Sequence, residues 1–174
     1  MSTPSLRPGP SLRPGEETVA LPDGFDAGLY FIGRIRTPWT GRDDSPKNSG
    51  ASDTVCTVEV EARYAAALRD VDTVSHLIVL YFMDRARRDI AVQAPGHYSR
   101  PHGTFALRSP ARPNPIALSV VRLLKVDGTR LEVVGLDCFD GTPLIDIKPY
   151  FASIDAVPDA TVGWHAAEAA ARSR

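Results

Sequence analysis

The sequence has few cysteines and no long apolar run, and these two absences exclude several classes of protein. Only two cysteines occur in 174 residues, Cys56 and Cys138, and neither belongs to a Cys-x-x-Cys pair. A disulfide-stabilised scaffold or a cysteine-based zinc site needs more thiols at closer spacing. No stretch reaches the roughly 20 apolar residues of a membrane span, and the N-terminus lacks the apolar segment of a secretory signal. We therefore expect a soluble protein of the reducing cytosol with no membrane partner.

A large excess of charge of one sign is also absent. The chain carries 20 Lys and Arg against 21 Asp and Glu, a net charge of −1, so it has no general attraction for nucleic acid. Locally the charge is uneven, because seven arginines and the single acid Asp89 lie between residues 85 and 122. These arginines are Arg85, Arg87, Arg88, Arg100, Arg108, Arg112 and Arg122. They either face RNA phosphates or pair with the acids that predominate after Lys125.

No G-x-G-x-x-G motif follows a strand and opens a helix, which leaves a dinucleotide-type Rossmann site without support. Short β patterns dominate instead. The residues from 55 to 61 alternate, with Val55, Thr57 and Glu59 on one face. Asp127-Gly128 is a strong hairpin signal between two apolar runs. We expect strands over residues 29–36, 55–61, 77–83, 116–125, 129–136 and 145–148. This pattern predicts a β-barrel or a β-sandwich.

The two ends of the chain differ from this β-rich middle. The pentapeptide Ser5–Gly9 recurs as Ser11–Gly15, and a segment so rich in Pro and Gly buries little. Alanine-rich sequence predicts one internal helix over residues 63–69 and a C-terminal helix from Trp164 to Arg172. The predicted organisation is therefore a flexible extension (residues 1–26), one barrel domain (27–160) and a short helix or tail (161–174).

Residues 103–119, GTFALRSPARPNPIALS, form the most informative segment of the chain. Three prolines in six residues fix backbone angles and remove donors, so this loop is stiff. A stiff loop can present Arg108 and Arg112 to an anionic ligand without losing much entropy on binding. Asn114 is a candidate for base recognition, since an amide can pair bidentately with an adenine edge. The plainer alternative is an Asn-Pro turn that merely starts a strand, with Asn114 capping its own loop.

Two further segments complete a pattern. Asp140-Gly141-Thr142-Pro143 is a turn between apolar runs, and an opening strand at residues 31–36 leads into Thr37-Pro38. Together with residues 103–119, these segments resemble the TrmO/YaeB-like family over about residues 29–150. Members of that family are S-adenosylmethionine-dependent tRNA methyltransferases. The resemblance implies a mainly β fold, a small closed or partly open barrel with short peripheral helices.

The resemblance also implies an activity, a cofactor and partners. The activity is N6-methylation of threonylcarbamoyladenosine beside the anticodon of tRNA, S-adenosyl-L-methionine is the methyl donor, and the assembly is a homodimer. Full-length bacterial relatives carry a further C-terminal domain implicated in tRNA handling, and this sequence stops soon after the barrel. Two alternatives therefore stay open: a cofactor-binding barrel module, and a small-molecule methyltransferase without tRNA activity.

The resemblance further implies where the cofactor is held. Family positions for cofactor binding fall on Pro46, Lys47, Asp84, Arg85, Arg108, Leu118, Asp140, Gly141 and Thr142. Lys47 stands where relatives carry arginine, and Asn48 where they carry glutamine. Asp84-Arg85 replaces a pair that is commonly His-Gln. The strongest elements of the pocket are kept, and its rim is altered.

The catalytic group is not assigned by the sequence. An exocyclic amine loses a proton on methylation, and Asp140, Asp146 and the phenol of Tyr81 are candidate acceptors. Asp140 can equally be a structural turn residue, and Asp146 can pair with Lys148. His97 and His102 lack a third ligand at any recognised spacing, so we expect no metal.

Overall fold

The computed structural model describes residues 11–48, 50 and 52–172. It divides into two compact units. Unit 1 is drawn from Met1–Pro22, Ala86–Asn114 and Ala152–Arg174, and unit 2 from Asp23–Arg85 and Pro115–Phe151. The first copy of the pentapeptide repeat lies outside the described residues, and the three-part organisation expected from the sequence stays a prediction.

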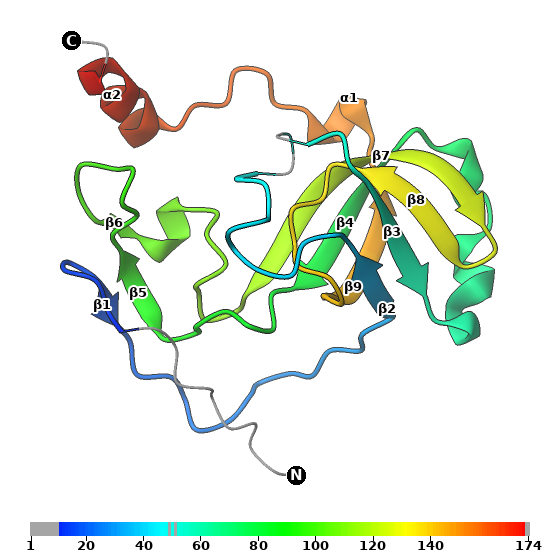
Figure 1. Ribbon diagram of the computed structural model, residues 1–174, viewed down its shortest axis with the longest axis horizontal. Coiled ribbons are helices and arrows are strands. Elements are labelled where there is room, and N and C mark those ends of the chain that lie inside the picture. Colours follow the sequence, from blue (N-terminus) through cyan, green and yellow to red (C-terminus); the bar gives the residue numbers. More distant parts are fainter. Residues whose placement is uncertain (1–10, 49, 51, 173–174) are drawn as a thin grey trace. The chain divides into compact units, whose positions relative to one another are not determined.

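Unit 2 is a closed β-barrel (Figure 1). Every strand pairs antiparallel with its neighbours, and β2 closes the barrel against β9. In barrel order the strands are β2 (Gly33–Arg36), β3 (Val55–Val60), β8 (Arg130–Val134), β7 (Ile116–Asp127), β4 (His76–Phe82) and β9 (Pro143–Pro149). This architecture confirms the mainly β, non-Rossmann fold expected from the sequence.

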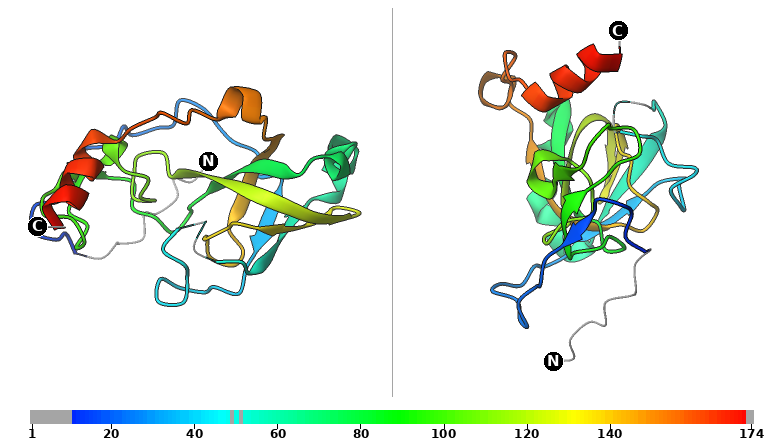
Figure 2. Two further views of the ribbon diagram at one scale, coloured as in Figure 1. Left: turned by 90° about the horizontal axis from the view of Figure 1, so that it is seen from above. Right: turned by 90° about the vertical axis from the view of Figure 1, so that its left-hand side faces the viewer.

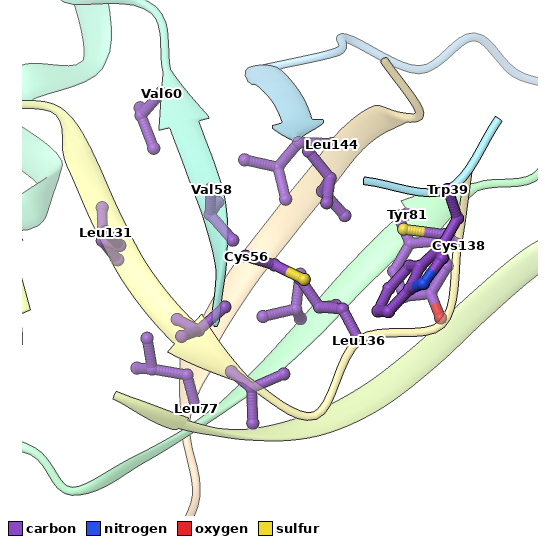
Figure 3. Packing of buried hydrophobic residues seen from close by; sticks show 14 residues of the cluster. Trp39, Cys56, Val58, Val60, Leu77, Tyr81, Leu131, Leu136, Cys138 and Leu144 are labelled. Atoms are coloured by element: carbon purple, nitrogen blue, oxygen red, sulfur yellow. The ribbon is translucent and has the colours of Figure 1, made fainter. Parts of the chain in front are cut away.

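The barrel core follows from alternation along the strands (Figure 3). In β3, Cys56, Val58 and Val60 are buried and the residues between them are not, as the alternating pattern predicted. In β4, Leu77 and Val79 point inward in the same way. Each fully buried aliphatic side chain contributes about 1.5–3 kcal/mol relative to an exposed one, so these alternating positions fix which face of each strand turns inward.

Two element predictions need adjustment, and a third is confirmed. The first strand covers only Gly33–Arg36, because its pairing with β3 begins at Gly33 opposite Val60, and Tyr30 before it is 86% exposed. The β7–β8 hairpin is confirmed, with Asp127 opposite Arg130 and Gly128 in the left-handed region at φ 59°. The internal helix is a 3-10 helix, η1 (Ala62–Leu68), followed by a shorter one, η2 (Val71–Thr73).

Unit 1 contains a small sheet that the sequence analysis missed. Its strands are β1 (Glu17–Thr18), β5 (Ile90–Gln93) and β6 (His102–Gly103), in the order β1-β5-β6. Further elements are η3 (Thr104–Ala106) and the single turn α1 (Ala152–Asp155). Strands of two to four residues give too short an alternation to be read from sequence.

The C-terminal helix α2 (Gly163–Arg172) confirms the helix predicted there. It docks on the loop between β5 and β6, beside which it lies in both views of Figure 2. The Trp164 ring lies 4.1 Å from the His102 ring and 4.9 Å from the Tyr98 ring, centroid to centroid. One turn on, the Glu168 carboxylate accepts hydrogen bonds from the Ser99 backbone and hydroxyl. Aromatic packing and a buried carboxylate therefore hold α2 in unit 1.

Within the described residues, no helix has the length and apolar character to cross a membrane.

Both cysteines are buried and unpaired with each other. Burial raises the pKa of Cys56 to about 11 and that of Cys138 to about 12. At pH 7.5 both groups stay protonated, so we expect alkylation by iodoacetamide at least about 100-fold slower than that of glutathione. Mass spectrometry of the native protein should show almost no adduct, and the protein in 6 M guanidinium should carry two. Rapid native labelling at either residue would contradict the packing of the barrel core.

Candidate functional site

The turn Asp140–Pro143 leads into β9 and is fastened by backbone hydrogen bonds to β2 and to the segment just after it. The Asp140 N–H donates to the Trp39 carbonyl at 2.7 Å, and the Gly141 N–H donates to the Ile35 carbonyl at 2.9 Å. Gly141 has φ 78°, a conformation that favours glycine. The Thr142 N–H turns back to the Phe139 carbonyl at 3.2 Å. The turn is therefore part of the barrel wall, with its three N–H groups already used.

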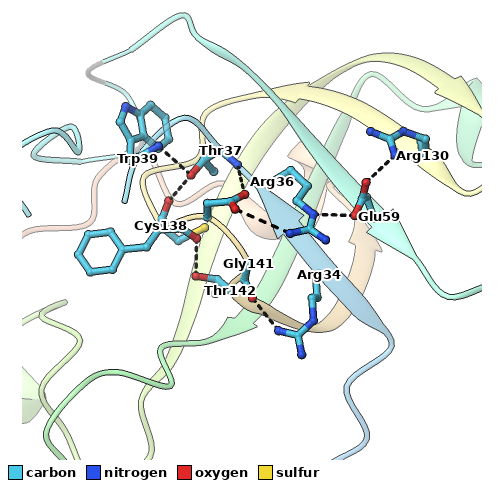
Figure 4. A network of polar contacts seen from close by, with 11 residues as sticks. Arg34, Arg36, Thr37, Trp39, Glu59, Arg130, Cys138, Gly141 and Thr142 are labelled. Carbon is cyan, nitrogen blue, oxygen red and sulfur yellow. Dashed lines mark hydrogen bonds and ion pairs between the residues drawn. The ribbon is translucent and has the colours of Figure 1, made fainter. Parts of the chain in front are cut away.

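Side chains reinforce this turn (Figure 4). Asp140 accepts a hydrogen bond from the Thr37 backbone at 3.2 Å through one oxygen, and its other oxygen lies 3.7 Å from the Arg36 guanidinium. The Thr37 hydroxyl donates to the Cys138 carbonyl at 2.9 Å. These contacts favour the structural reading of Asp140 over a role as proton acceptor.

An ion network extends from Arg36 across the outside of the barrel (Figure 4). Glu59 lies 2.7 Å from the Arg36 Nε and 2.5 Å from the Arg130 guanidinium. The hydrogen bond from Arg36, aided by both positive charges, holds the pKa of Glu59 below its ordinary value of 4.5. Glu59 therefore ties β2, β3 and β8 together while it is ionised.

This pKa shift makes the contribution of Glu59 pH-dependent. A lowered folded-state pKa gives stability that is present above pH 4.5 and is lost as the pH falls through the folded value. We expect Glu59→Gln to lower the free energy of unfolding by about 1 kcal/mol at pH 7 and by almost nothing near pH 2. The value at pH 7 is kept small because solvent weakens ion pairs between partly exposed side chains. Urea unfolding at both pH values measures this. Glu61→Gln is the matched control, because the Glu61 carboxylate pairs with the exposed Arg63 outside this network. A gap of the same size at both pH values would contradict the network.

The other two candidate proton acceptors also have structural partners. The Tyr81 side chain is 2% exposed, and its hydroxyl lies 2.9 Å from both the Ser119 hydroxyl and the Asp137 carboxylate, to which it donates. Burial raises the pKa of Tyr81 above its ordinary value, which keeps the phenol protonated in this structure. Asp146 lies 2.6 Å from the Lys148 ammonium, the pairing that the sequence offered as its alternative role.

Three predicted cofactor-binding positions lie around strand ends of unit 2. Arg85, just after β4, lies with its guanidinium 5.7 Å from the centre of the Phe139 ring, and it donates to the Thr40 carbonyl at 3.4 Å. The structure thus brings Arg85 together with the segment that leads into the Asp140 turn. Its neighbour Asp84 is exposed, and so is Leu118, 43% exposed on β7 opposite Leu80 of β4.

Pro46 and Lys47 lie on the loop between β2 and β3. Pro46 is half-buried and Lys47 is exposed. Just before them, Asp44 accepts hydrogen bonds from the backbone N–H groups of Thr40 and Gly41, both at 2.9 Å. Because Arg85 bonds to the same Thr40, this loop and the end of β4 are linked through one residue.

The remaining predicted positions belong to unit 1. Arg108 is exposed on the loop after η3. Arg112 does not extend outward, since its guanidinium donates to the backbone carbonyls of Thr104, Leu107 and Ser109. Asn114 accepts a hydrogen bond from Arg88 at 3.3 Å through its amide oxygen. Arg112 thus makes contacts inside its own loop, and the Asn114 amide oxygen braces the turn. Ligand contacts by these two residues stay predictions.

The arginine-rich segment is largely used to build the fold. Arg87 pairs with Asp89 at 2.7 Å, and Arg88 donates to the Pro113 carbonyl at 2.6 Å. Sequence reasoning missed the role of Arg88 because a carbonyl partner leaves no charge pattern in the sequence. Arg100 and Arg122 are exposed, as Arg108 is, and these three remain on the surface of their units.

Two other observations concern binding sites outside the predicted positions. A depression of about 260 Å³ is lined by Gly33, Arg34 and the residues 59–61, none of them among the predicted positions. In the part of the chain that the structure describes, no group of three His, Cys, Asp or Glu side chains is placed to hold a metal ion.

Comparison with known proteins shows which family has this sequence and fold. The family model of the tRNA-methyltransferase O N-terminal domain matches residues 34–156. The chain belongs to the TrmO family. The match spans all but the first residue of the barrel strands of this TrmO-family chain, together with the loop that carries Arg108.

Individual relatives agree. A protein of Rhizobium radiobacter named probable S-adenosyl-L-methionine-binding protein VirR is 46% identical over 138 residues, 79% of each chain. The tRNA (adenine(37)-N6)-methyltransferase of Eikenella corrodens is 48% identical over 71 residues, 39% of this chain and 40% of that one. The crystal structure of TrmO from Pseudomonas aeruginosa matches with a TM-score of 0.66 and 33% identity over 80% of this chain. The TrmO-family chain spans 61% of that solved protein.

Proposed function

We propose that this chain is an S-adenosylmethionine-dependent methyltransferase that methylates the N6 position of an adenine in tRNA, namely threonylcarbamoyladenosine beside the anticodon. The observation that carries the proposal is the family match over residues 34–156, which includes both the barrel and the Arg108 loop. The names of the Rhizobium radiobacter and Eikenella corrodens relatives support the cofactor and the acceptor in turn.

The residues present are of the kinds that this cofactor needs. Its methionine carboxylate calls for a guanidinium, and Arg108 is exposed on a stiff loop. Its adenine calls for an apolar surface, which Leu118 and the half-exposed Phe139 provide. Lys47 keeps a positive charge where relatives carry arginine. The N–H groups of the Asp140–Thr142 turn are engaged within the barrel, so we assign that turn to the shape of the site and not to hydrogen-bond donation.

S-adenosylmethionine supplies an activated methyl group, so the protein's part is to orient the acceptor and exclude water. Correct placement alone can be worth roughly 7–11 kcal/mol of the barrier in favourable cases. Asp140, Asp146 and Tyr81 each hold a structural partner in this fold. We therefore propose positioning, without a dedicated side-chain base among these three, as the main source of rate.

A homodimer belongs to the same proposal. Within unit 2, β7 presents a row of exposed apolar side chains on its outer face, a feature that supports association with a second copy. These residues are Ile116, Leu118, Val120 and Leu124. Sedimentation of the purified protein tests this part separately.

The second candidate function is a barrel that binds the cofactor without transferring its methyl group. The departures at Lys47, Asp84 and Arg85 favour it, as do relatives named only for binding. The two functions separate in one assay: incubation of tRNA carrying threonylcarbamoyladenosine with S-adenosylmethionine deuterated in the methyl group, followed by nucleoside mass spectrometry. We expect a labelled N6-methyl product. Cofactor binding with no labelled nucleoside from that tRNA would favour the binding module.

A further inference from the structure

The loop that carries Arg108 is folded around the side chain of Arg112. The Arg112 Nε donates to the Ser109 carbonyl at 3.0 Å, and one terminal nitrogen donates to the carbonyls of Thr104, at 3.2 Å, and Leu107. The Leu107 carbonyl immediately precedes Arg108, and the Ser109 carbonyl follows it. One guanidinium therefore fixes the backbone on both sides of Arg108.

Gln93, the last residue of β5, holds both ends of the same loop. Its amide nitrogen donates to the Thr104 hydroxyl at 3.0 Å and to the Ala111 carbonyl at 2.7 Å. The Thr104 hydroxyl donates in turn to the Ile90 carbonyl at 2.9 Å. Gln93 is 4% exposed and Thr104 is 2% exposed, so neither side chain is placed to touch a ligand. A buried side chain with polar partners of this kind acts on the loop alone.

The far end of the loop is held from the segment before β5. The Arg112 N–H donates to the Arg87 carbonyl at 3.1 Å. Arg88 donates to the Pro113 carbonyl at 2.6 Å and to the Asn114 amide oxygen at 3.3 Å. With Pro110 and Pro113 restricting the chain between these contacts, the loop from Thr104 to Asn114 has few alternative conformations.

We propose that Arg112, Gln93 and Thr104 are positioning residues. They hold the Arg108 loop in its binding conformation before a ligand arrives. This inference rests on the proposed function, in which Arg108 contacts the carboxylate of the cofactor. A preset loop lowers the entropy lost on binding, and the affinity depends on how well Arg108 is held. The Arg112 Nε carries one N–H group and the terminal nitrogen carries two. All three donate to carbonyls inside the loop, those of Ser109, Thr104 and Leu107.

Trypsin provides a direct reading of loop order in the protein without cofactor. Cleavage after Arg108 requires the loop to open, whereas position 112 is followed by Pro113 and resists trypsin whether it is Arg, Lys or Met. We expect Arg112→Met and Arg112→Lys to raise the initial rate of cleavage after Arg108 at least about tenfold. Lysine keeps the charge but lacks the planar fork that reaches three carbonyls.

Cofactor affinity provides the second reading. Calorimetric titration with S-adenosylmethionine should show about tenfold weaker binding for Arg112→Met, Arg112→Lys and Gln93→Leu alike, because a displaced Arg108 loses its partner. Gln93→Leu matters most, since this buried side chain can affect binding only through the loop. All titrations are made at temperatures where circular dichroism shows each variant fully folded.

Distinct results overturn the inference or the function beneath it. Unchanged cleavage after Arg108 in Arg112→Met would overturn the brace, and lost affinity with unchanged cleavage would make Arg112 a direct ligand contact. Full affinity in Arg112→Lys or in Gln93→Leu would also overturn it. If the wild-type protein binds no S-adenosylmethionine, the proposed function fails, and the cleavage rates still decide whether Arg112 orders the loop. Should Arg112→Met not fold, Gln93→Leu carries both readings.

Discussion

Arg108→Ala is expected to weaken S-adenosylmethionine binding by about 10- to 150-fold, the range for losing a charge-assisted contact worth about 1.5–3 kcal/mol. The expected cause is the loss of the guanidinium that meets the methionine carboxylate in the proposed site. Arg108 is exposed on a loop whose backbone is held at both flanking carbonyls, so truncation should leave that backbone in place. Equilibrium dialysis with labelled cofactor measures the change.

Arg100→Ala is the matched control for this experiment. Arg100 is another exposed arginine of unit 1, it directly precedes Pro101, and no cofactor role is assigned to it. Its removal should leave the affinity within about twofold, in keeping with the small effect of an exposed charge at a distance. Equal losses in both variants would mean that Arg108 contributes only general positive charge. An unchanged affinity in Arg108→Ala would remove the loop from the proposed site.

Gly33→Ala is expected to destabilise the barrel by about 3 kcal/mol or more, or to prevent folding. A Cβ atom at this position would lie 1.9 Å from the Glu59 carbonyl oxygen, inside the backbone of the neighbouring strand. Backbone cannot yield as a flexible side chain can. To relieve the overlap, β2 would have to move away from β3 and lose the pairing of Gly33 with Val60. Chemical unfolding followed by circular dichroism measures the loss.

Gly28→Ala separates this steric effect from the general consequence of replacing glycine. Gly28 belongs to the same unit, and a Cβ built there meets nothing within 4 Å. Its substitution should change the free energy of unfolding by less than about 1 kcal/mol, through the unfolded chain alone. A Gly33→Ala protein as stable as Gly28→Ala would show that β2 is not packed against β3 as described.

The strand pattern predicted a barrel or a sandwich because most of the barrel strands are long enough to show their period, and the family resemblance favoured the barrel. Cys56, Val58 and Val60 alternate with outward residues, and Asp127-Gly128 marks the hairpin between β7 and β8. The segments that escaped, β1, β5 and β6, have two to four residues each. An alternation of that length is indistinguishable from chance, so only tertiary pairing defines them.

The candidate site was only partly accessible from sequence for a different reason. Residue type predicted ligand contacts for Arg112 and Asn114, but it could not predict that Arg112 also donates to loop carbonyls and that Asn114 accepts a hydrogen bond from Arg88. Carbonyl acceptors occur at every residue and leave no motif. The role of Tyr81 was hidden for another reason, because its partners Ser119 and Asp137 lie far from it in sequence. Gln93 went unnoticed because nothing local distinguishes a buried glutamine that bridges two loop ends.

The central claim is that this TrmO-family chain binds S-adenosylmethionine, and calorimetric titration of the purified protein tests it most directly. We predict saturable binding with a dissociation constant in the micromolar range, a free energy of about −8 kcal/mol. The titration is repeated in the presence of tRNA, so that binding which requires the acceptor is also detected. No binding heat in either titration, from protein shown to be folded, would contradict the account.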